Sequence, residues 1–224
     1  MKIYHGSRNI IEKPVFGVGN RFNDYGLGFY CTEDIELAKE WACVDGSSVG
    51  YANAYLLETE GLNICNLEDG RYNILNWIAL LLENRRFDTT SLMAINAKNY
   101  LLENFRIDTD DADVIIGYRA DDSYFSFAKD FINNTISVRQ LSRAMRLGNL
   151  GTQVVLKSER AFSQLEFLSY ETASPEEYYI KRQARDEQAR DEYLRGPLRA
   201  ETLNDDIFVM DIIRRGLKNG DEIL

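Results

Sequence analysis

The order of strand-like and helix-like segments is the feature that most constrains the fold of this chain. Short apolar runs typical of strands are separated by helical patterns of very different lengths. A regular parallel sheet requires strands and helices to alternate one for one. The pattern therefore predicts an α+β domain in which strands far apart in the sequence pair with each other. The expected strands are 2–5, 29–31, 51–57, 112–118, 150–157 and 165–170.

Two helices are predicted between the third and fourth of these strands. Segment 74–82 is apolar nearly all round, which indicates a helix buried on several sides. Segment 91–105 has apolar residues at helical spacing and is expected to pack on it. Together they form a helical insertion at about 70–106. The short run 63–65 is interpreted either as a continuation of strand 51–57 or as its partner.

Helix boundaries are marked at several other places. Thr32 is the expected N-cap of a helix that carries Trp41 and ends near Asp45, and Ser137 is the expected N-cap of another helix. A one-turn helix is predicted at 158–163.

The last fifty residues are expected to form a helical extension. A charged helix is predicted at 175–195 and an amphipathic one at 207–217, separated by Gly196-Pro197. The chain is thus divided into a domain at 1–172 and an extension at 173–224. The apolar stripe of the final helix either packs on its own domain or docks a partner protein; its members are Ile207, Met210, Ile213 and Leu217.

Composition excludes several classes of protein. The net charge of −10 opposes binding of free nucleic acid. No apolar run reaches the ~18 residues of a membrane-spanning helix, and the first residues lack the pattern of a signal peptide. A cytoplasmic protein without membrane association is therefore expected. Three cysteines and a single histidine favour neither a disulfide framework nor a metal site.

The chemically distinctive residues lie near the beginning of the chain. His5 is the only histidine, and Gly6 after it permits close approach of the backbone to a ligand. Tyr30 and Trp41 flank the first helix. Their rings are interpreted either as core residues or as two faces that sandwich a planar group, worth ~1 kcal/mol per stack beyond burial.

Three blocks of sequence carry a resemblance to a known superfamily. They are Tyr-His-Gly-Ser-Arg at 4–8, Gly-Leu-Gly-Phe-Tyr at 26–30 and Leu-Gly-Asn-Leu-Gly-Thr-Gln-Val-Val-Leu-Lys-Ser at 147–158. The first two resemble the NAD-binding half of ADP-ribosyltransferases of the diphtheria-toxin and poly-ADP-ribose-polymerase types. All three, over 4–167, resemble a bacterial domain family of that superfamily that is often associated with toxin–antitoxin modules.

The resemblance implies a fold, an activity and partners. The fold would be a split antiparallel β-sandwich with inserted helices and a helical C-terminal tail. The activity would be transfer of ADP-ribose from NAD, the co-substrate, to a macromolecular acceptor, without a metal. A toxin-like role would add an antitoxin as a possible partner.

The resemblance also assigns roles to individual residues. His5 would hold a ribose hydroxyl of NAD, and the backbone of Gly6 would pair with the nicotinamide carboxamide. Ser7 and Arg8 would lie along the ribose and phosphates. Tyr30 would stack on the nicotinamide, Trp41 would provide a second ring, and Gln153 would orient the ribose, which completes the catalytic set His5, Tyr30 and Gln153.

Two positions depart from the pattern of the resemblance. Gln153 stands where a glutamate is usual, and Ala38 stands where polymerase-type enzymes have a serine. An amide cannot supply the negative charge that stabilises an oxocarbenium-like state, and losing one such group costs ~10²–10³ in rate. NAD hydrolysis and a non-catalytic module that binds NAD, ADP-ribose or a partner are therefore the alternative functions.

Other acidic residues are candidates for the missing carboxylate. Arg119, Asp121 and Asp122 follow a buried strand, a usual place for a functional loop, and form a possible substrate loop. Glu159 and Glu166 lie close to Gln153 in sequence. For Glu159 the first turn of a short helix is the expected place, and Glu166 is expected to point away from the pocket.

Overall fold

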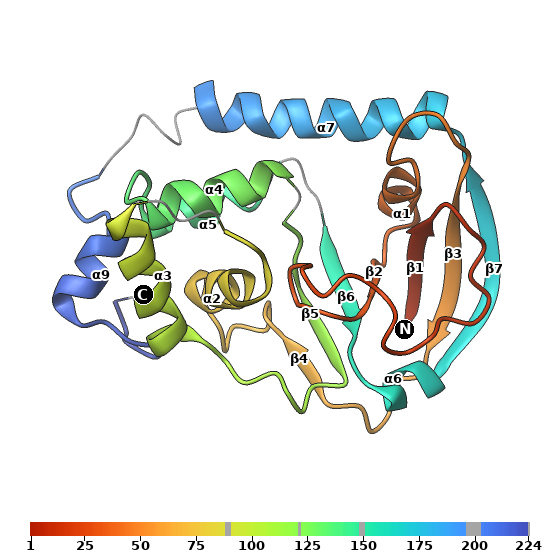
Figure 1. Cartoon of the computed structure of the whole chain (residues 1–224), viewed down its shortest axis with the longest axis horizontal. Helices are drawn as coiled ribbons and strands as arrows, with labels where there is room; N and C mark the ends of the chain where they lie inside the picture. Colours follow the sequence, from red (N-terminus) through yellow and green to blue (C-terminus); the bar gives the residue numbers. More distant parts are fainter. Residues whose placement is uncertain (88–90, 121, 148–150, 196–202, 224) are drawn as a thin grey trace.

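Two β-sheets lie side by side in the computed structural model, which describes residues 1–87, 91–120, 122–147, 151–195 and 203–223 (Figure 1). The first sheet has the order β1-β3-β7 and is antiparallel throughout; the second has the order β2-β6-β5-β4. The prediction of an α+β protein with pairing between distant strands is confirmed. The strands are β1 (Lys2–Ser7), β2 (Phe29–Cys31), β3 (Gly50–Leu57), β4 (Ile64–Asn66), β5 (Val114–Tyr118), β6 (Thr152–Leu156) and β7 (Leu165–Ala173).

A β-bridge between Tyr4 and Thr32 joins the two sheets. The backbone of Tyr4 in β1 donates to the carbonyl of Thr32 at 2.8 Å and accepts from its N–H at 2.9 Å. Beside this bridge, side chains from both sheets fill one core and exclude water from the space between them. Its buried members are Ile3, Cys31, Tyr55, Leu57, Val114, Val154, Leu156 and Ala161.

The position of β4 corrects one prediction. Segment 63–65 was expected to continue or pair with β3, but Ile64 pairs with Val114 of β5, and the two strands are parallel. A parallel pair needs a long crossover connection. The inserted helices between β4 and β5 provide it, so the expectation of a wholly antiparallel sandwich is wrong at this edge.

The helices α2 to α5 form a second core on the other side of the second sheet (Figure 1, left). Helix α2 is buried from Ile74 to Leu82, as its uniformly apolar sequence predicts. The helices are α1 (Ile35–Ala42), α2 (Ile74–Asn84), α3 (Leu92–Phe105), α4 (Asp122–Ile132), α5 (Val138–Ala144), α6 (Glu159–Ser163), α7 (Pro175–Arg195) and α9 (Val209–Arg215).

The start of α1 differs from the sequence-based expectation. Asp34, not Thr32, is the N-cap, and its carboxylate accepts from the N–H of Glu36 at 2.8 Å. Thr32 is unsuited to the cap because its backbone is already engaged with Tyr4 in the bridge between the sheets. The helix still carries Trp41 near its end, as predicted.

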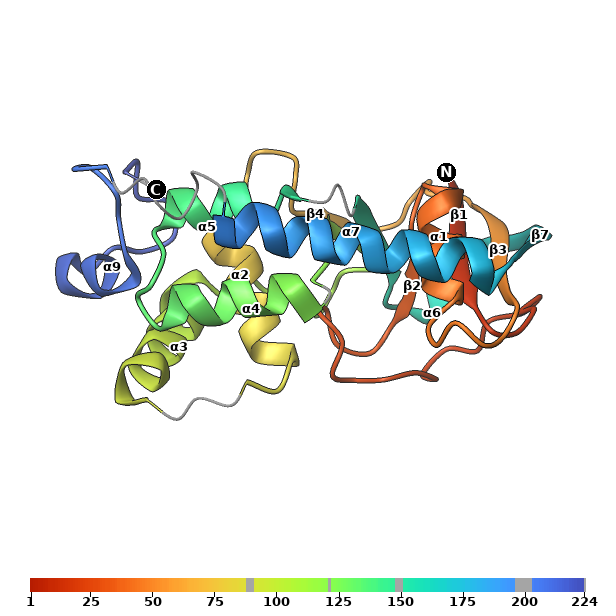
Figure 2. The ribbon, with the colours of Figure 1, turned by 90° about the horizontal axis from the view of Figure 1, so that it is seen from above.

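Helix α7 runs along the top of the molecule and contacts both α1 and α4 (Figures 1 and 2). Its bounds agree with the predicted charged helix, and α9 packs on α3. Val209 and Ile212 of α9 are buried in the second core. These two residues are not members of the predicted stripe, of which Ile207, Ile213 and Leu217 are only partly buried against the same core. The final helix therefore packs on its own chain, but through a side that the stripe does not define. The division at residue 172 stays a prediction.

The helical insertion provides a test of this packing. Leu101 in α3 is fully buried, whereas Leu92 at the start of the same helix is 79% exposed. Leu101→Ala is expected to lower the free energy of unfolding by about 2–5 kcal/mol, because it leaves a cavity in the core. Leu92→Ala, the matched control, is expected to change it by less than about 0.5 kcal/mol. Urea denaturation measures both, and equal effects would contradict the packing of α3.

Candidate functional site

Four of the predicted site residues line one pocket. Tyr30, Trp41, Arg119 and Gln153 surround a cavity of about 240 Å³. Pockets that enclose a small-molecule ligand typically have volumes of ~300–1,000 Å³. This cavity therefore has room for only part of a dinucleotide. The remaining lining residues are Asn23, Asp24, Arg85, Ala120 and Arg182.

The ring of Tyr30 is fixed in the pocket wall by its hydroxyl group. The hydroxyl donates to the carbonyl of Gly26 at 2.6 Å and accepts from the N–H of Tyr25 at 3.0 Å. Gly26 has φ 73°, a left-handed conformation that glycine adopts without strain. Burial raises the pKa of Tyr30 well above its usual value, which keeps the hydroxyl protonated at neutral pH.

Trp41 enters the pocket from the last turn of α1. The guanidinium of Arg119 lies over its ring, 4.3 Å from the centroid, in a cation–π contact. One face of the indole is thus already covered, and only the other could stack on a ligand. Its Nε1 is buried and has no hydrogen-bond partner among the residues that the structure describes. A buried donor of this kind favours a ligand with an acceptor group.

Gln153 stands at the beginning of β6, opposite Gly117 of β5. Its Nε2 donates to Oδ2 of Asp24 at 3.2 Å. Since an ionised carboxylate only accepts hydrogen bonds, this contact fixes which way the amide faces. Oε1 of Gln153 is then buried and has no hydrogen-bond partner among the described residues.

Asp24 is the carboxylate of this pocket, and it was not among the predicted site residues. It is 3% exposed; its Oδ2 accepts from the N–H of Ala120 at 2.8 Å, and its Oδ1 lies 2.7 Å from Nε of Arg85. Burial is the largest influence and raises the pKa of Asp24 above its usual value. The charges of Arg85 and Arg119 and the N–H of Ala120 oppose this rise only in part. The carboxylate therefore joins four separate segments of the chain around the cavity.

The sequence contained a usable indication of this residue. Asp24 directly precedes Tyr-Gly-Leu-Gly-Phe-Tyr, one of the blocks that carry the resemblance, and Arg85 directly follows the apolar helix α2. A charged residue at the end of a fully buried helix needs a partner. Asp24 and Arg85 are 61 positions apart in the sequence, so the sequence alone does not show that the two side chains meet.

His5 lies behind the pocket wall and does not line the cavity. It was expected to end its strand, but β1 continues to Ser7. Its Nδ1 is 2.7 Å from the carbonyl of Tyr30, and its ring stacks on Phe29 at 4.3 Å. Burial lowers the pKa of His5, and the bond to Tyr30 opposes this. A carbonyl only accepts, so Nδ1 is the donor and Nε2 of the neutral ring is an acceptor.

Gly6 is in close contact with α1. A Cβ at this position would lie 2.0 Å from the carbonyl oxygen of Ala38 and 2.9 Å from Cβ of Trp41. Only glycine lets the strand come this near to the helix. The residue thus brings α1, and with it Trp41, against β1.

The next two predicted residues face other parts of the surface. Ser7 accepts from the N–H of Asn9 at 3.0 Å, and Arg8 forms an exposed ion pair with Asp45 at 2.6 Å. Neither lines the cavity.

Only two of the four remaining acidic candidates have described side chains. Asp121 lies outside the described residues, as does the side chain of Asp122, which begins α4. Glu159 is in the first turn of α6, and Glu166 is exposed on β7. Both positions agree with the expectation for these two glutamates.

Two further findings concern the described part of the chain. A larger cavity of about 570 Å³ lies between α2, α5 and the C-terminal segment, and it contains none of the predicted site residues. Among the described residues, no helix is long and apolar enough to cross a membrane, and no group of three or more His, Cys, Asp or Glu side chains converges on a metal site.

The structure is that of an α+β protein with a small pocket that three arginines line among the described residues. The chain belongs to the DUF3990 family, a protein family of unknown function, whose model matches residues 1–167. That match includes every lining residue of the pocket except Arg182. Comparison with curated proteins and with solved structures gave no match.

The pairing of Asp24 with Arg85 leads to a prediction that depends on pH. Arg85→Gln leaves a buried carboxylate without its cation, which is expected to cost about 3 kcal/mol at pH 7. Protonation of Asp24 removes that charge, so the cost is expected to shrink as the pH falls below the pKa of Asp24. Denaturation curves at several pH values measure this.

The matched control for this prediction is the next residue along the chain. Arg86 is exposed and lies over the ring of Phe22, 3.9 Å from its centroid. Arg86→Gln is expected to have a small effect that does not vary with pH. If Arg85→Gln behaved in the same way, Asp24 would not depend on this ion pair.

Proposed function

We propose that the protein is an NAD-dependent ADP-ribosyltransferase that passes ADP-ribose to a macromolecular acceptor. The observation that supports this most strongly is that Tyr30, Trp41 and Gln153, which the resemblance assigns to the nicotinamide end of NAD, line one cavity. Tyr30 and Trp41 lie on the consecutive elements β2 and α1, whereas Gln153 comes from β6, more than a hundred positions further along the chain. The two sheets with a common core are compatible with an ADP-ribosyltransferase-like sandwich.

The hydrogen-bonding groups of the pocket suit nicotinamide riboside. In this proposal the nicotinamide stacks on Tyr30, Trp41 Nε1 donates to a ligand oxygen, and Gln153 Oε1 accepts from a ribose hydroxyl. Neither of these two buried atoms has a partner among the described residues. His5 does not line the cavity, and in this proposal it acts through its hydrogen bond to the carbonyl of Tyr30, which holds the strand that carries the stacking ring.

The reaction would break the bond between the nicotinamide nitrogen and C1′ of the ribose. Nicotinamide leaves with the bonding electron pair, and the ribose develops positive charge until the acceptor's nucleophile attacks. Gln153 supplies no charge, but the carboxylate of Asp24 is one hydrogen bond behind it. Its negative charge, in a site shielded from water, favours the cationic transition state.

The test is incubation of the purified protein with NAD, with and without a cell lysate. Nicotinamide release together with labelling of a macromolecule supports transfer. Free ADP-ribose without any acceptor would instead indicate NAD hydrolysis. A non-catalytic binding module is the second candidate, favoured by the uncharged Gln153; it predicts NAD binding by calorimetry without nicotinamide release.

Tyr30 provides a specific prediction. Tyr30→Ala removes the proposed stacking surface and is expected to weaken NAD binding about tenfold or more. Tyr170→Ala, on the exposed side of β7, is the control and is expected to bind NAD as the unchanged protein does. Calorimetry measures both affinities, and equal values would contradict stacking on Tyr30.

The contact between Gln153 and Asp24 predicts an unusual result for restoring the glutamate. Gln153→Glu alone places two carboxylates together, and such a pair shares a proton. Any gain in nicotinamide release is then expected only as the pH rises. Exchanging the groups, in Asp24→Asn combined with Gln153→Glu, keeps one carboxylate and one amide. At pH 7 that double variant is expected to release nicotinamide at least about tenfold faster than the unchanged protein.

The control for the exchange is Asp24→Asn alone, which lacks a carboxylate at both positions and is expected to be the slowest. Thermal melting shows that each variant is folded. A folded double variant no faster than Asp24→Asn would indicate that the carboxylate has no part in the reaction.

A further inference from the structure

Helix α7 lies beyond the region that the family model matches, yet it reaches the candidate site. Arg182 of this helix lines the cavity together with Arg85 and Arg119. The domain division at residue 172 would assign it to an appendage. Arg182 therefore adds a positive charge to the cavity from outside the matched region.

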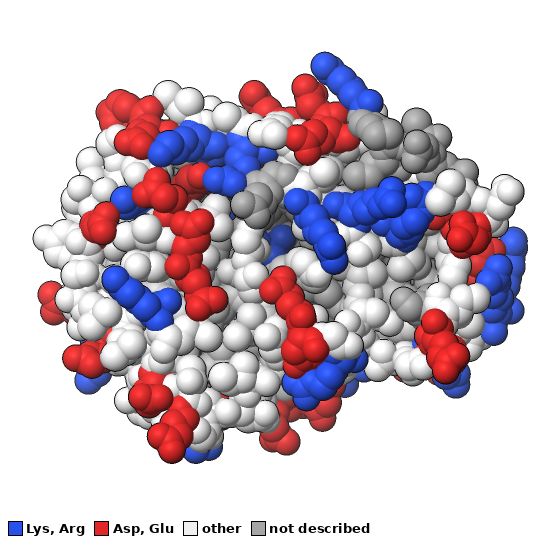
Figure 3. Space-filling view, turned by 180° about the vertical axis from the view of Figure 1, so that it is seen from behind, with Lys and Arg blue, Asp and Glu red and all other residues white. Residues whose placement is uncertain are grey.

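The charge of the cavity is opposite to that of the protein. Among the residues that the structure describes, three guanidinium groups and one carboxylate, Asp24, line it, which leaves two positive charges from these groups in a chain with a net charge of −10. On the face seen from behind, basic and acidic side chains are interspersed with many uncharged ones (Figure 3). A local positive potential in an acidic protein concentrates anionic ligands.

Two of the three arginines already interact with other side chains of the pocket, whereas Arg182 makes few contacts of its own. Arg85 is paired with Asp24, and Arg119 covers Trp41. Arg182 makes one long bond, from Nη1 to the carbonyl of Val44 at 3.4 Å, and forms no ion pair with a described residue. Its neighbours on the helix, Lys181 and Arg185, both pair with carboxylates of α1.

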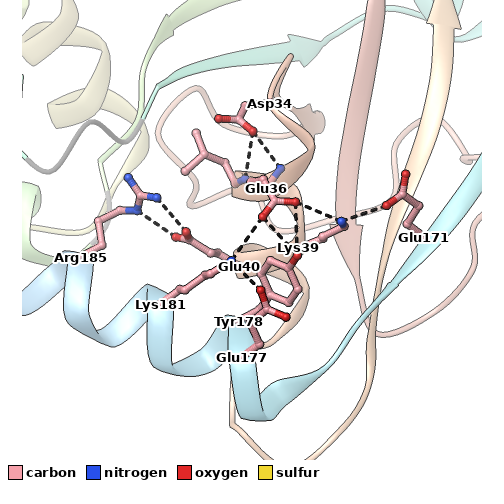
Figure 4. Close-up of polar contacts among 10 residues, drawn as sticks. Asp34, Glu36, Lys39, Glu40, Glu171, Glu177, Tyr178, Lys181 and Arg185 are labelled. Atoms are coloured by element: carbon pink, nitrogen blue, oxygen red, sulfur yellow. Dashed lines mark hydrogen bonds and ion pairs between the residues drawn. The ribbon is translucent and has the colours of Figure 1, made fainter.

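Those neighbouring pairs hold α7 against α1 (Figure 4). The guanidinium of Arg185 binds the buried carboxylate of Glu40 through two bonds, of 2.9 and 2.8 Å. The hydroxyl of Tyr178 donates to Glu36, and Lys181 pairs with the same group. A bidentate contact of this kind fixes geometry as well as adding energy. Arg182 is therefore carried on a helix that is anchored on both sides of it.

The far end of α7 is anchored as well. Tyr193 is buried, its ring lies 4.0 Å from that of Phe127 in α4, and its hydroxyl donates to Asp130. The helix thus spans from α1 to α4 (Figure 2). An arginine in its middle is positioned by contacts at both ends and is free to use its own charge on a ligand.

We propose that Arg182 binds the diphosphate group of the ligand, so that α7 is a wall of the site and the C-terminal extension is part of the functional unit. Two adjacent anionic phosphates match the two excess positive charges, and the planar guanidinium fork suits phosphate oxygens. The cavity of about 240 Å³ holds the other end of the ligand, and the phosphates extend from it toward α7. The identity of the dinucleotide rests on the proposed function, whereas diphosphate binding does not.

The experiment measures binding of inorganic pyrophosphate to the full chain by calorimetry at low salt. Arg182→Gln is expected to weaken binding about tenfold or more, because a charge-assisted contact is lost. Arg182→Lys retains the charge and is expected to bind more tightly than Arg182→Gln. The matched control is Arg195→Gln, which removes the same charge from an 81% exposed side chain of the same helix and is expected to leave binding unchanged.

A second variant tests the anchoring of the helix. Glu40→Gln removes the charge that binds Arg185 without altering the cavity, and it is expected to speed hydrogen exchange in α7 and to weaken pyrophosphate binding. Glu36→Gln, which breaks a more exposed pair, is expected to have a smaller effect. Faster exchange in α7 with unchanged pyrophosphate binding would overturn the role of the helix.

Different experimental outcomes would contradict the two proposals, diphosphate binding by Arg182 and ADP-ribosyl transfer. If neither pyrophosphate nor ADP binds, or if Arg182→Gln and Arg195→Gln bind pyrophosphate equally, Arg182 is not a diphosphate ligand, whatever the protein does to NAD. If Arg182→Gln weakens pyrophosphate binding but the unchanged protein releases no nicotinamide from NAD, the proposed transferase activity is wrong and the anion site stands.

Discussion

The buried carboxylate of Asp24 is the group on which the candidate site depends. A charge removed from water must be paired and hydrogen-bonded, and Asp24 meets this need with Arg85, the N–H of Ala120 and the amide of Gln153. These partners come from the end of α2, the segment after β5 and the start of β6. The inserted helices are therefore tied to the pocket as well as to the hydrophobic core.

The short contact between the sheets has a comparable role. One bridge between Tyr4 and Thr32 aligns β1 with β2, which sets His5 against the backbone of Tyr30. Gly6 then allows α1 to approach β1 closely enough to carry Trp41 to the cavity. Tyr30 and Trp41 thus form part of one wall, in which the strand and the helix that carry them are positioned by backbone contacts.

The C-terminal extension changes how the molecule should be divided. Its long helix is held on both sides of Arg182, by Tyr178 and Lys181 before it and by the bidentate ion pair of Arg185 after it, and so brings Arg182 to the cavity. An acidic chain with an arginine-rich pocket favours an anionic ligand. The geometry of α7 places the extension at the same pocket as the residues of the matched region.

The sequence by itself determined the α+β class and most elements, because periodicity and capping residues act locally: α2, α6 and α7 begin within a residue or two of their predicted starts. It also identified Tyr30, Trp41, Arg119 and Gln153. Only the tertiary structure decided that β4 pairs in parallel with β5, that Asp34 replaces Thr32 as N-cap, and that Asp24, Arg85 and Arg182 complete the pocket. Such pairings depend on which distant segments meet, and a buried charge shows its partner only when the chain has folded around it.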